Sequence, residues 1–220
     1  MVDDPDPTGM VVRGYDRLAR RWEDWADEVD PALRDRYVDW LEDRLDPGSS
    51  VLELGSGTGR PVAERLVSCH RYVGVDLSSA MVTVARRNVP AGRFLVADMR
   101  HVDLPAGQFD AVVAFYSIIH VPRGDHPALL RQVHRWLRPG GYFVACFSSG
   151  DLAAGVDDDW LDAGPMYWSG YDANTNLRML SDAGFEEIDA EVVPQTEGED
   201  EVQFLWCTAQ RPVPDSETAG

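Results

Sequence analysis

The sequence contains no lysine, so arginine carries all of its fixed positive charge. Its 20 arginines are outnumbered by 38 aspartate and glutamate residues, which gives a formal net charge of −18 at pH 7. A field of this sign repels phosphate backbones. No cluster of arginines with interleaved aromatic residues counters it. The composition therefore argues against nucleic acid as a partner or substrate.

Cysteine is also scarce. Cys69, Cys146 and Cys207 are far apart and form no C-x-x-C pair, so neither a disulfide framework nor a zinc site is predicted. The acidic run Asp157-Asp158-Asp159 has no partner ligands at a metal-binding spacing, and we interpret it as a solvent-facing segment. We therefore expect no metal centre.

Long hydrophobic runs are missing as well. No apolar segment approaches the ~20 residues that a membrane span needs, and the acidic N-terminus has no hydrophobic segment of the kind a signal peptide carries. We expect a cytoplasmic protein without a membrane partner. A length of 220 residues fits one domain, 1–220, with flexible ends at 1–9 and 211–220. We expect a monomer or a homodimer.

A glycine-rich turn follows the first predicted strand. The strand covers residues 51–54, and the chain then reads Gly55-Ser56-Gly57-Thr58-Gly59 as a helix expected at 58–68 begins. Glycines at alternating positions permit positive φ angles and let the backbone approach a ligand. The G-x-G-x-G spacing differs from the G-x-G-x-x-G of the dinucleotide fingerprint. Taken alone, the turn fits either a ligand site or a tight strand-to-helix connection.

A second predicted strand, at 71–76, ends in a carboxylate. Asp76 follows the glycine turn by about 20 residues, the position from which an acidic residue holds a ribose diol in dinucleotide-binding folds. The turn and Asp76 together predict a nucleoside-binding site.

Strands and helices alternate along most of the chain. The pattern predicts helices at 10–28, 31–45, 58–68, 78–88, within 122–137 and at 174–183, and strands at 51–54, 71–76, 93–97, 108–116, 142–147, 185–193 and 202–209. Strands that alternate with helices of this length indicate parallel crossovers and an α/β fold. The last two strands have no helix between them, so we expect them to pair antiparallel.

Residues 149–172 interrupt this alternation. They show no clear periodicity and contain Trp160, Tyr167 and Trp168. A connection of this length is usually functional or disordered, and the aromatic residues argue against disorder. We interpret the segment as a lid or a wall of the substrate pocket. The alternative is a surface insertion with a local aromatic cluster.

Four separately placed features together resemble the class I S-adenosylmethionine-dependent methyltransferases. They are the segment 51–59, Asp76, Asp98 after the third strand, and the run Arg138-Pro139-Gly140-Gly141 before the fifth. A nicotinamide dehydrogenase would need only the first two. The resemblance covers residues 48–148 most strongly. It implies a seven-stranded Rossmann-like sheet, mostly parallel with an antiparallel last strand, helices on both faces, and two extra N-terminal helices over the cofactor cleft.

The resemblance also implies S-adenosyl-L-methionine as the cofactor and assigns roles to residues. Asp76 would hold the ribose hydroxyls, Leu77 would lie against the adenine, and Asp98 would accept from the adenine amino group. Tyr15, in a Tyr-Asp-x-x-Ala segment, would lie over the sulfonium end. The full implied set of cofactor-binding residues is Tyr15, Glu53, Gly55, Ser56, Gly57, Asp76, Leu77, Asp98, Met99 and Phe115.

His120 lies just past the fourth predicted strand, at the sheet edge where ligands bind. An alcohol or phenol acceptor benefits from a base of this kind, so we expect His120 and Tyr15 to be catalytic. The alternative is a structural histidine. The expected substrate-binding residues are His120, Trp160, Tyr167 and Trp168.

The aromatic content of these segments favours an aromatic or apolar small molecule as the acceptor. We expect methyl transfer to oxygen rather than to nitrogen or sulfur. Two alternatives stay open. One is a cofactor-binding enzyme of the same fold that catalyses a cyclisation or rearrangement, and the other is a non-catalytic binding protein.

Overall fold

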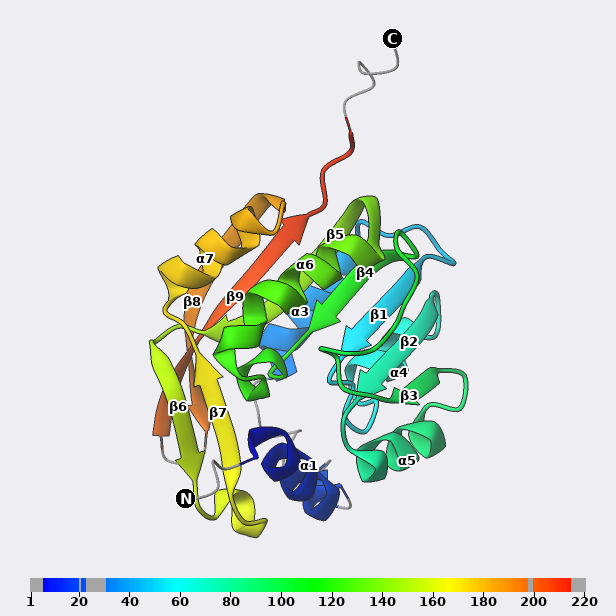
Figure 1. The fold of residues 1–220 in the computed structure, drawn as a ribbon. Coiled ribbons are helices and arrows are strands. Elements are labelled where there is room, and N and C mark those ends of the chain that lie inside the picture. Colours follow the sequence, from blue (N-terminus) through cyan, green and yellow to red (C-terminus); the bar gives the residue numbers. More distant parts are fainter. Residues whose placement is uncertain (1–5, 20, 23–30, 198–199, 215–220) are drawn as a thin grey trace.

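The computed structural model describes residues 6–19, 21–22, 31–197 and 200–214 (Figure 1). Its main element is a seven-stranded sheet in the order β3-β2-β1-β4-β5-β9-β8. The strands are β1 (Ser50–Leu54), β2 (Arg71–Asp76), β3 (Arg93–Val96), β4 (Phe109–Ala114), β5 (Leu137–Ser148), β8 (Glu186–Glu197) and β9 (Asp200–Gln210). Strands β1 to β5 pair in parallel, and β9 pairs antiparallel with β5 and β8. The predicted α/β sheet is confirmed.

Helices cover both faces of the sheet, as predicted. One face carries α3 (Pro31–Glu42), α4 (Val62–Leu66) and α5 (Ser79–Asn88), and the other carries α6 (His126–Trp136) and α7 (Ala173–Asp182). Strand β1 shows why both layers are needed, because Val51 packs into the first core while Leu52 and Leu54 pack into the second. A strand that is apolar on both sides is stable only between two layers.

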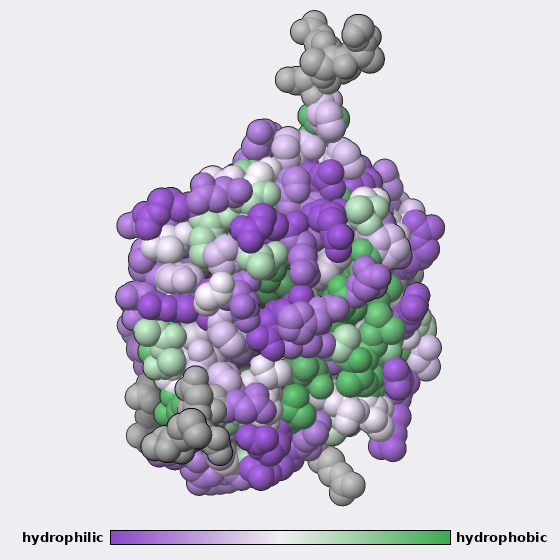
Figure 2. Space-filling view, viewed as in Figure 1, coloured by the Kyte–Doolittle hydropathy of each residue, from purple (hydrophilic) through white to green (hydrophobic). Residues whose placement is uncertain are grey.

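The α6–α7 layer leaves part of the sheet uncovered. Figure 2 shows apolar side chains at the surface over β2 and β3. Val73, Leu95 and Leu104 are partly buried apolar residues of this part of the chain. Ala97 and Met99 belong to the same group and also line the cleft described below. The edge of the sheet at β3 is therefore apolar up to that cleft.

Helix α1 (Pro7–Leu18) begins earlier than predicted. Asp6 caps it by accepting a hydrogen bond from the Gly9 N–H at 3.0 Å, and Pro7 occupies its first turn. Both are standard helix-start signals, so the part of the expected flexible leader from Pro7 onward is helical. The rest of the predicted 10–28 helix, including Trp25, falls largely outside the described residues.

The expectation that two N-terminal helices cover the cleft is wrong for the second of them. Helix α3 packs on a face of the sheet, where Tyr37 stacks on Trp206 with ring centroids 4.7 Å apart. Its buried residues Leu33, Tyr37 and Leu41 belong to the main core. Apolar burial against the sheet therefore determines the position of α3, and α1 alone of the two lies against the cleft.

Helix α4 is shorter than the predicted helix at 58–68. It begins at Val62, because Gly55, Gly57 and Gly59 all have positive φ angles of 78°, 51° and 79°. A residue in the left-handed region cannot belong to a right-handed helix. The turn therefore continues through Gly59, and the helix follows it.

Residues 149–172 form a hairpin, which the sequence pattern did not predict. Strand β6 (Leu152–Asp157) pairs antiparallel with β7 (Met166–Gly170), and the short 3-10 helix η3 (Trp160–Asp162) joins them. Glycine, alanine and aspartate in β6 are poor strand formers, which concealed the pairing. Strand β7 packs against the 3-10 helix η1 (Ile118–His120).

The predicted flexible C-terminus starts with an ordered residue. The Arg211 N–H donates to the Gly141 carbonyl at 2.9 Å, and the Gly140 N–H donates to the Arg211 carbonyl at 2.8 Å. The Arg138-Pro139-Gly140-Gly141 run thus forms part of a longer β5. Residues 215–220 of the expected tail lie outside the described part of the chain. Across the described residues, no helix combines the length and the apolar character needed to cross a bilayer.

Candidate active site

A cleft lies at the carboxyl ends of β1 to β4, where the strand order reverses between β1 and β4. This is the usual ligand position in open α/β sheets. Its volume is about 710 Å³, including space open to solvent. The lining consists of Thr8, Val11, Val12 and Tyr15 from α1, Trp22, Gly55 and Gly57, residues 75–78 at the end of β2, residues 97–100 after β3, and residues 116, 117 and 120–122 after β4.

Asp76 organises the glycine turn. One carboxylate oxygen accepts from the Gly57 N–H and the other from the Ser78 N–H, both at 2.8 Å. Burial raises the pKa of Asp76 to about 6, against the lowering effect of these backbone donors. A carboxylate has about four acceptor sites, so Asp76 keeps capacity for ligand hydroxyls. It lines the cleft, together with Leu77.

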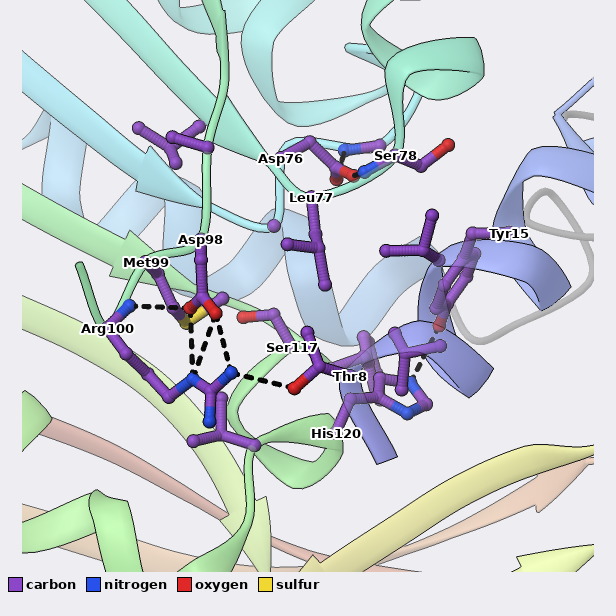
Figure 3. A pocket seen from close by; sticks show the side chains of 18 of the residues that line it. Thr8, Tyr15, Asp76, Leu77, Ser78, Asp98, Met99, Arg100, Ser117 and His120 are labelled. Atoms are coloured by element: carbon purple, nitrogen blue, oxygen red, sulfur yellow. Dashed lines mark hydrogen bonds and ion pairs between the residues drawn. The ribbon is translucent and has the colours of Figure 1, made fainter. Parts of the chain in front are cut away.

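Asp98 is already paired with a cation. The Arg100 guanidinium donates to both of its oxygens at 2.6 to 3.1 Å, and the Arg100 backbone N–H adds a bond of 2.9 Å (Figure 3). Burial would raise the pKa of Asp98, but these bonds hold it below its ordinary value. Arg100 also donates to Asp125 and to Thr8 of α1. Arg100 was not among the residues predicted from the sequence, where its position just after Asp98 was the available signal.

Tyr15 and His120 meet across 105 residues of sequence. The Tyr15 hydroxyl lies 2.7 Å from His120 Nε2, and His120 Nδ1 lies 2.9 Å from the Tyr167 carbonyl oxygen (Figure 3). Because a carbonyl oxygen only accepts, Nδ1 carries the proton. Nε2 therefore accepts from Tyr15. Burial lowers the pKa of His120 to about 4, so the imidazole is neutral at pH 7.

We expect the His120 imidazole to titrate near pH 4 rather than near the ordinary value of about 6.5, because burial disfavours its charged form. NMR of the histidine ring signals over a pH series measures this directly. The signal is assigned with the His120→Gln variant. A midpoint near 6.5 would contradict the buried, neutral state.

Three tryptophans surround this pair. Trp22 and Trp160 lie 5.2 and 5.6 Å from the Tyr15 ring, and Trp168 lies 4.3 Å from the His120 ring, centroid to centroid. Trp22 lines the cleft, whereas Trp160 and Trp168 are absent from its lining and pack against Tyr15 and His120. We define Tyr15, Trp22, His120, Trp160 and Trp168 as the aromatic cluster. Trp22 was not among the predicted site residues, because its only signal in the sequence was its spacing along a predicted helix.

Tyr167 contributes differently from the expectation. Its carbonyl oxygen accepts from His120, while its side chain is buried with Met10, Val11 and Met166. Alternation along β7 turns Tyr167 and Trp168 to opposite sides. Its side chain is therefore not among those that line the cleft.

Three residues of the expected cofactor-binding set are also buried and absent from the cleft lining. Glu53 accepts a hydrogen bond from the Tyr72 hydroxyl, Ser56 packs beside Gly74, and Phe115 packs on Trp206. Their side chains support the strands beneath the cleft. Contacts between their backbone and the cofactor stay a prediction.

Glu53→Gln is expected to weaken the pH dependence of stability. Burial raises the pKa of Glu53 from 4.5 to about 7, so the folded state keeps a proton that the unfolded state has lost. Stability therefore falls as pH rises from about 4.5 to about 7, by up to roughly 3 kcal/mol. Urea unfolding at about pH 5 and about pH 8 measures the difference. The exposed control Glu186→Gln should behave as wild type, and an unchanged slope in Glu53→Gln would refute the assignment.

The acidic run in the hairpin folds locally. The Asp157 carboxylate accepts from the Asp159 N–H at 3.0 Å, and the Asp159 carboxylate accepts from the Gly164 N–H at 3.2 Å. Within the described ranges, no group of three or more histidine, cysteine, aspartate or glutamate side chains is placed to hold a metal ion.

The comparisons with known proteins match the segment that contains the glycine turn, Asp76 and Asp98. A family model described as a methyltransferase domain matches residues 51–141. Phosphoethanolamine N-methyltransferase 3 of Arabidopsis thaliana is 33% identical over 169 residues, which cover 70% of this chain and 32% of the relative. The ubiquinone biosynthesis O-methyltransferase of Pseudomonas aeruginosa is 32% identical over 142 residues, 59% of each chain. The chain thus spans about a third of the length of the first relative and about three fifths of the length of the second.

A solved structure supports the fold independently. A SAM-dependent methyltransferase from Methanosarcina mazei superposes with a TM-score of 0.67 and 16% identity, covering 79% of this chain and 97% of that one. At this identity the likeness concerns the fold alone.

Proposed function

The chain belongs to the class I S-adenosylmethionine-dependent methyltransferases, and from this premise we propose that it methylates a small molecule. The observation that carries the proposal is the cleft at the strand-order reversal, in which the Asp76-bonded glycine turn faces the Tyr15–His120 pair. When bound, S-adenosyl-L-methionine supplies an electrophilic methyl group on a cationic sulfur.

The residues on the β1–β3 side of the cleft fit this cofactor. A Cβ at Gly55 would overlap the Ser117 side chain, so the turn requires glycine there. Asp76 has acceptor capacity for the ribose hydroxyls, and Leu77 and Met99 offer apolar walls for the adenine. Asp98 would share its oxygens between the adenine amino group and Arg100. We propose Gly55, Gly57, Asp76, Leu77, Asp98 and Met99 as the cofactor-binding residues that face the cleft, with Glu53, Ser56 and Phe115 beneath them.

Tyr15 and His120 fit the role of a proton relay. As an acceptor oxygen bonds to the methyl carbon, its own proton becomes strongly acidic. That proton would pass to the Tyr15 oxygen while the Tyr15 proton moves to His120 Nε2, along the existing 2.7 Å bond. A base with a pKa of about 4 is sufficient because the proton becomes acidic during the transfer. We propose both residues as catalytic.

The cleft lining favours an uncharged acceptor. Among the described residues that line it, Arg100 is the one arginine, and Asp98 and Asp125 already pair with it. A phosphate-bearing acceptor would therefore find no available cation there. We propose O-methylation of an aromatic or apolar metabolite, with Trp160 and Trp168 shaping the acceptor end.

N-methylation of an amine is the second candidate. The aromatic residues Tyr15 and Trp22 line the cleft, and aromatic faces attract ammonium groups. The net charge of −18 would also favour the approach of a cationic acceptor.

The first test is a calorimetric titration of the protein with S-adenosylmethionine, S-adenosylhomocysteine and NAD. We expect the first two to bind and NAD not to bind. Formation of S-adenosylhomocysteine with a panel of phenols and amines then separates the two acceptor classes. Cofactor binding without methyl release to any acceptor would favour a cyclase or a rearranging enzyme. No binding of either sulfur nucleoside would refute the proposal.

A further inference from the structure

A second hollow lies beside the aromatic cluster, between the β6–β7 hairpin and the β5–β9 pair. Its volume is about 770 Å³, including space open to solvent, within the range of about 300–1,000 Å³ for small-ligand sites. Its apolar lining residues are Ile119, Leu152, Trp168, Val202 and Phe204. We call this space the hairpin groove.

Two of the three polar residues that line the groove, Ser148 and Ser169, bond to the protein itself, and the third is Gln203. The Ser148 hydroxyl donates to the Gly150 carbonyl at 2.7 Å, and the Ser169 hydroxyl donates to the Val121 carbonyl at 2.8 Å. Both hydroxyls therefore have protein partners and make no demand on a ligand. Leu152 is 40% exposed although it is a large apolar residue. Such a surface suits an apolar ligand, whose burial there removes hydrocarbon from water.

One side chain connects the groove to the proposed catalytic pair. Trp168 lines the groove, and its ring lies 4.3 Å from the His120 ring with an interplanar angle of 38°. Ile119, the residue before His120, also lines the groove. Two hydrogen bonds hold the hairpin at this point. The Tyr167 carbonyl of β7 accepts from His120 Nδ1, and the Ser169 hydroxyl donates to the Val121 carbonyl. Trp168 therefore contacts both the groove and the His120 ring, and these two hydrogen bonds fix β7 beside them.

We propose that the hairpin groove binds the apolar tail of the methyl acceptor. This inference rests on the proposed function and specifies its substrate class: a hydroxyl on an aromatic ring or short chain that carries an alkyl or aryl tail. The hydroxyl would reach Tyr15 and His120, and the tail would lie along Trp168 toward Leu152 and Phe204.

The test uses a series of 4-alkylphenols, from phenol to 4-hexylphenol, titrated calorimetrically into the protein saturated with S-adenosylhomocysteine. In the wild type, we expect the dissociation constant to fall roughly threefold per added methylene. Leu152→Asp should abolish this length dependence while phenol itself binds unchanged. Val156→Asp is the matched control, because Val156 lies on the same strand, is 46% exposed and does not line the groove.

Each outcome decides the inference. Length dependence that is lost in Leu152→Asp and kept in Val156→Asp supports it. Length-independent binding, no phenol binding, or an equal effect of both variants overturns it. Should Leu152→Asp fail to bind S-adenosylhomocysteine, Val202→Asp replaces it as the groove variant. If the wild type itself binds no S-adenosylhomocysteine, the proposed function fails, and the inference fails with it.

Discussion

Asp76→Ala is expected to weaken the binding of S-adenosylmethionine and S-adenosylhomocysteine on the order of 100-fold. The substitution removes the acceptor proposed for the ribose hydroxyls, and hydrogen bonds to a charged group contribute about 1.5–3 kcal/mol each. It also removes the partner of the Gly57 and Ser78 amides, which lie 2.8 Å from the carboxylate. The turn that faces the cofactor would lose its fixed conformation as well. Both effects act on the same equilibrium constant.

Calorimetry with S-adenosylhomocysteine measures this loss, and thermal unfolding shows whether the variant is folded. Asp76→Asn keeps one oxygen acceptor, so we expect an intermediate affinity. Asp103→Ala changes an exposed aspartate that does not line the cleft and should bind as the wild type does. Wild-type affinity in a folded Asp76→Ala protein would remove Asp76 from the cofactor site.

Tyr15→Phe is expected to lower turnover of a hydroxyl acceptor by about 10²- to 10⁴-fold, the range typical of general acid–base catalysis. The substitution keeps the ring that packs against Trp22 and Trp160 and removes the hydroxyl bonded to His120. The affinity for S-adenosylhomocysteine should therefore stay within about threefold. His120→Gln should give a loss of similar size, since either substitution interrupts the same relay.

The double variant distinguishes a relay from two independent contributions. Residues that act as a unit are not additive, so we expect Tyr15→Phe with His120→Gln to be about as slow as the slower single variant. The measurement is the initial rate of S-adenosylhomocysteine formation. Tyr142→Phe, a tyrosine that packs against Trp40 far from the cleft, is the control. Unchanged turnover in Tyr15→Phe, or multiplied losses in the double variant, would refute the relay.

The proposed cofactor half of the cleft was predictable because its signals are local. Asp76 and Asp98 each end an apolar strand, and in a parallel sheet the carboxyl ends of such strands meet at one edge. The glycine turn follows the same logic, since Gly55 and Gly57 have the positive φ angles that the spacing suggested. Both aspartates and both glycines line one cleft.

The proposed acceptor half was harder to predict because it depends on contacts between distant segments. Tyr15 and His120 were each identified, but no pattern in the sequence indicates that the hydroxyl of one bonds the ring of the other. The Arg100–Asp98 pair was missed because it depends on the path of the chain after β3. Strand β6 was missed because its composition resembles a loop, and pairing with β7 overrides that weak propensity.

The sequence by itself determined the order of the helices and of the strands in the main sheet, the edge predicted to bind a nucleoside, and the family, because apolar periodicity, turn glycines and strand-end carboxylates act over a few residues. Tertiary structure alone decided three further features. It placed α3 on the sheet and α1 at the cleft. It selected the His120 tautomer in which Nε2 accepts a hydrogen bond from the Tyr15 hydroxyl, and it formed the hairpin groove. Each of these depends on which buried surfaces fit together, and that fit is a property of packing in three dimensions.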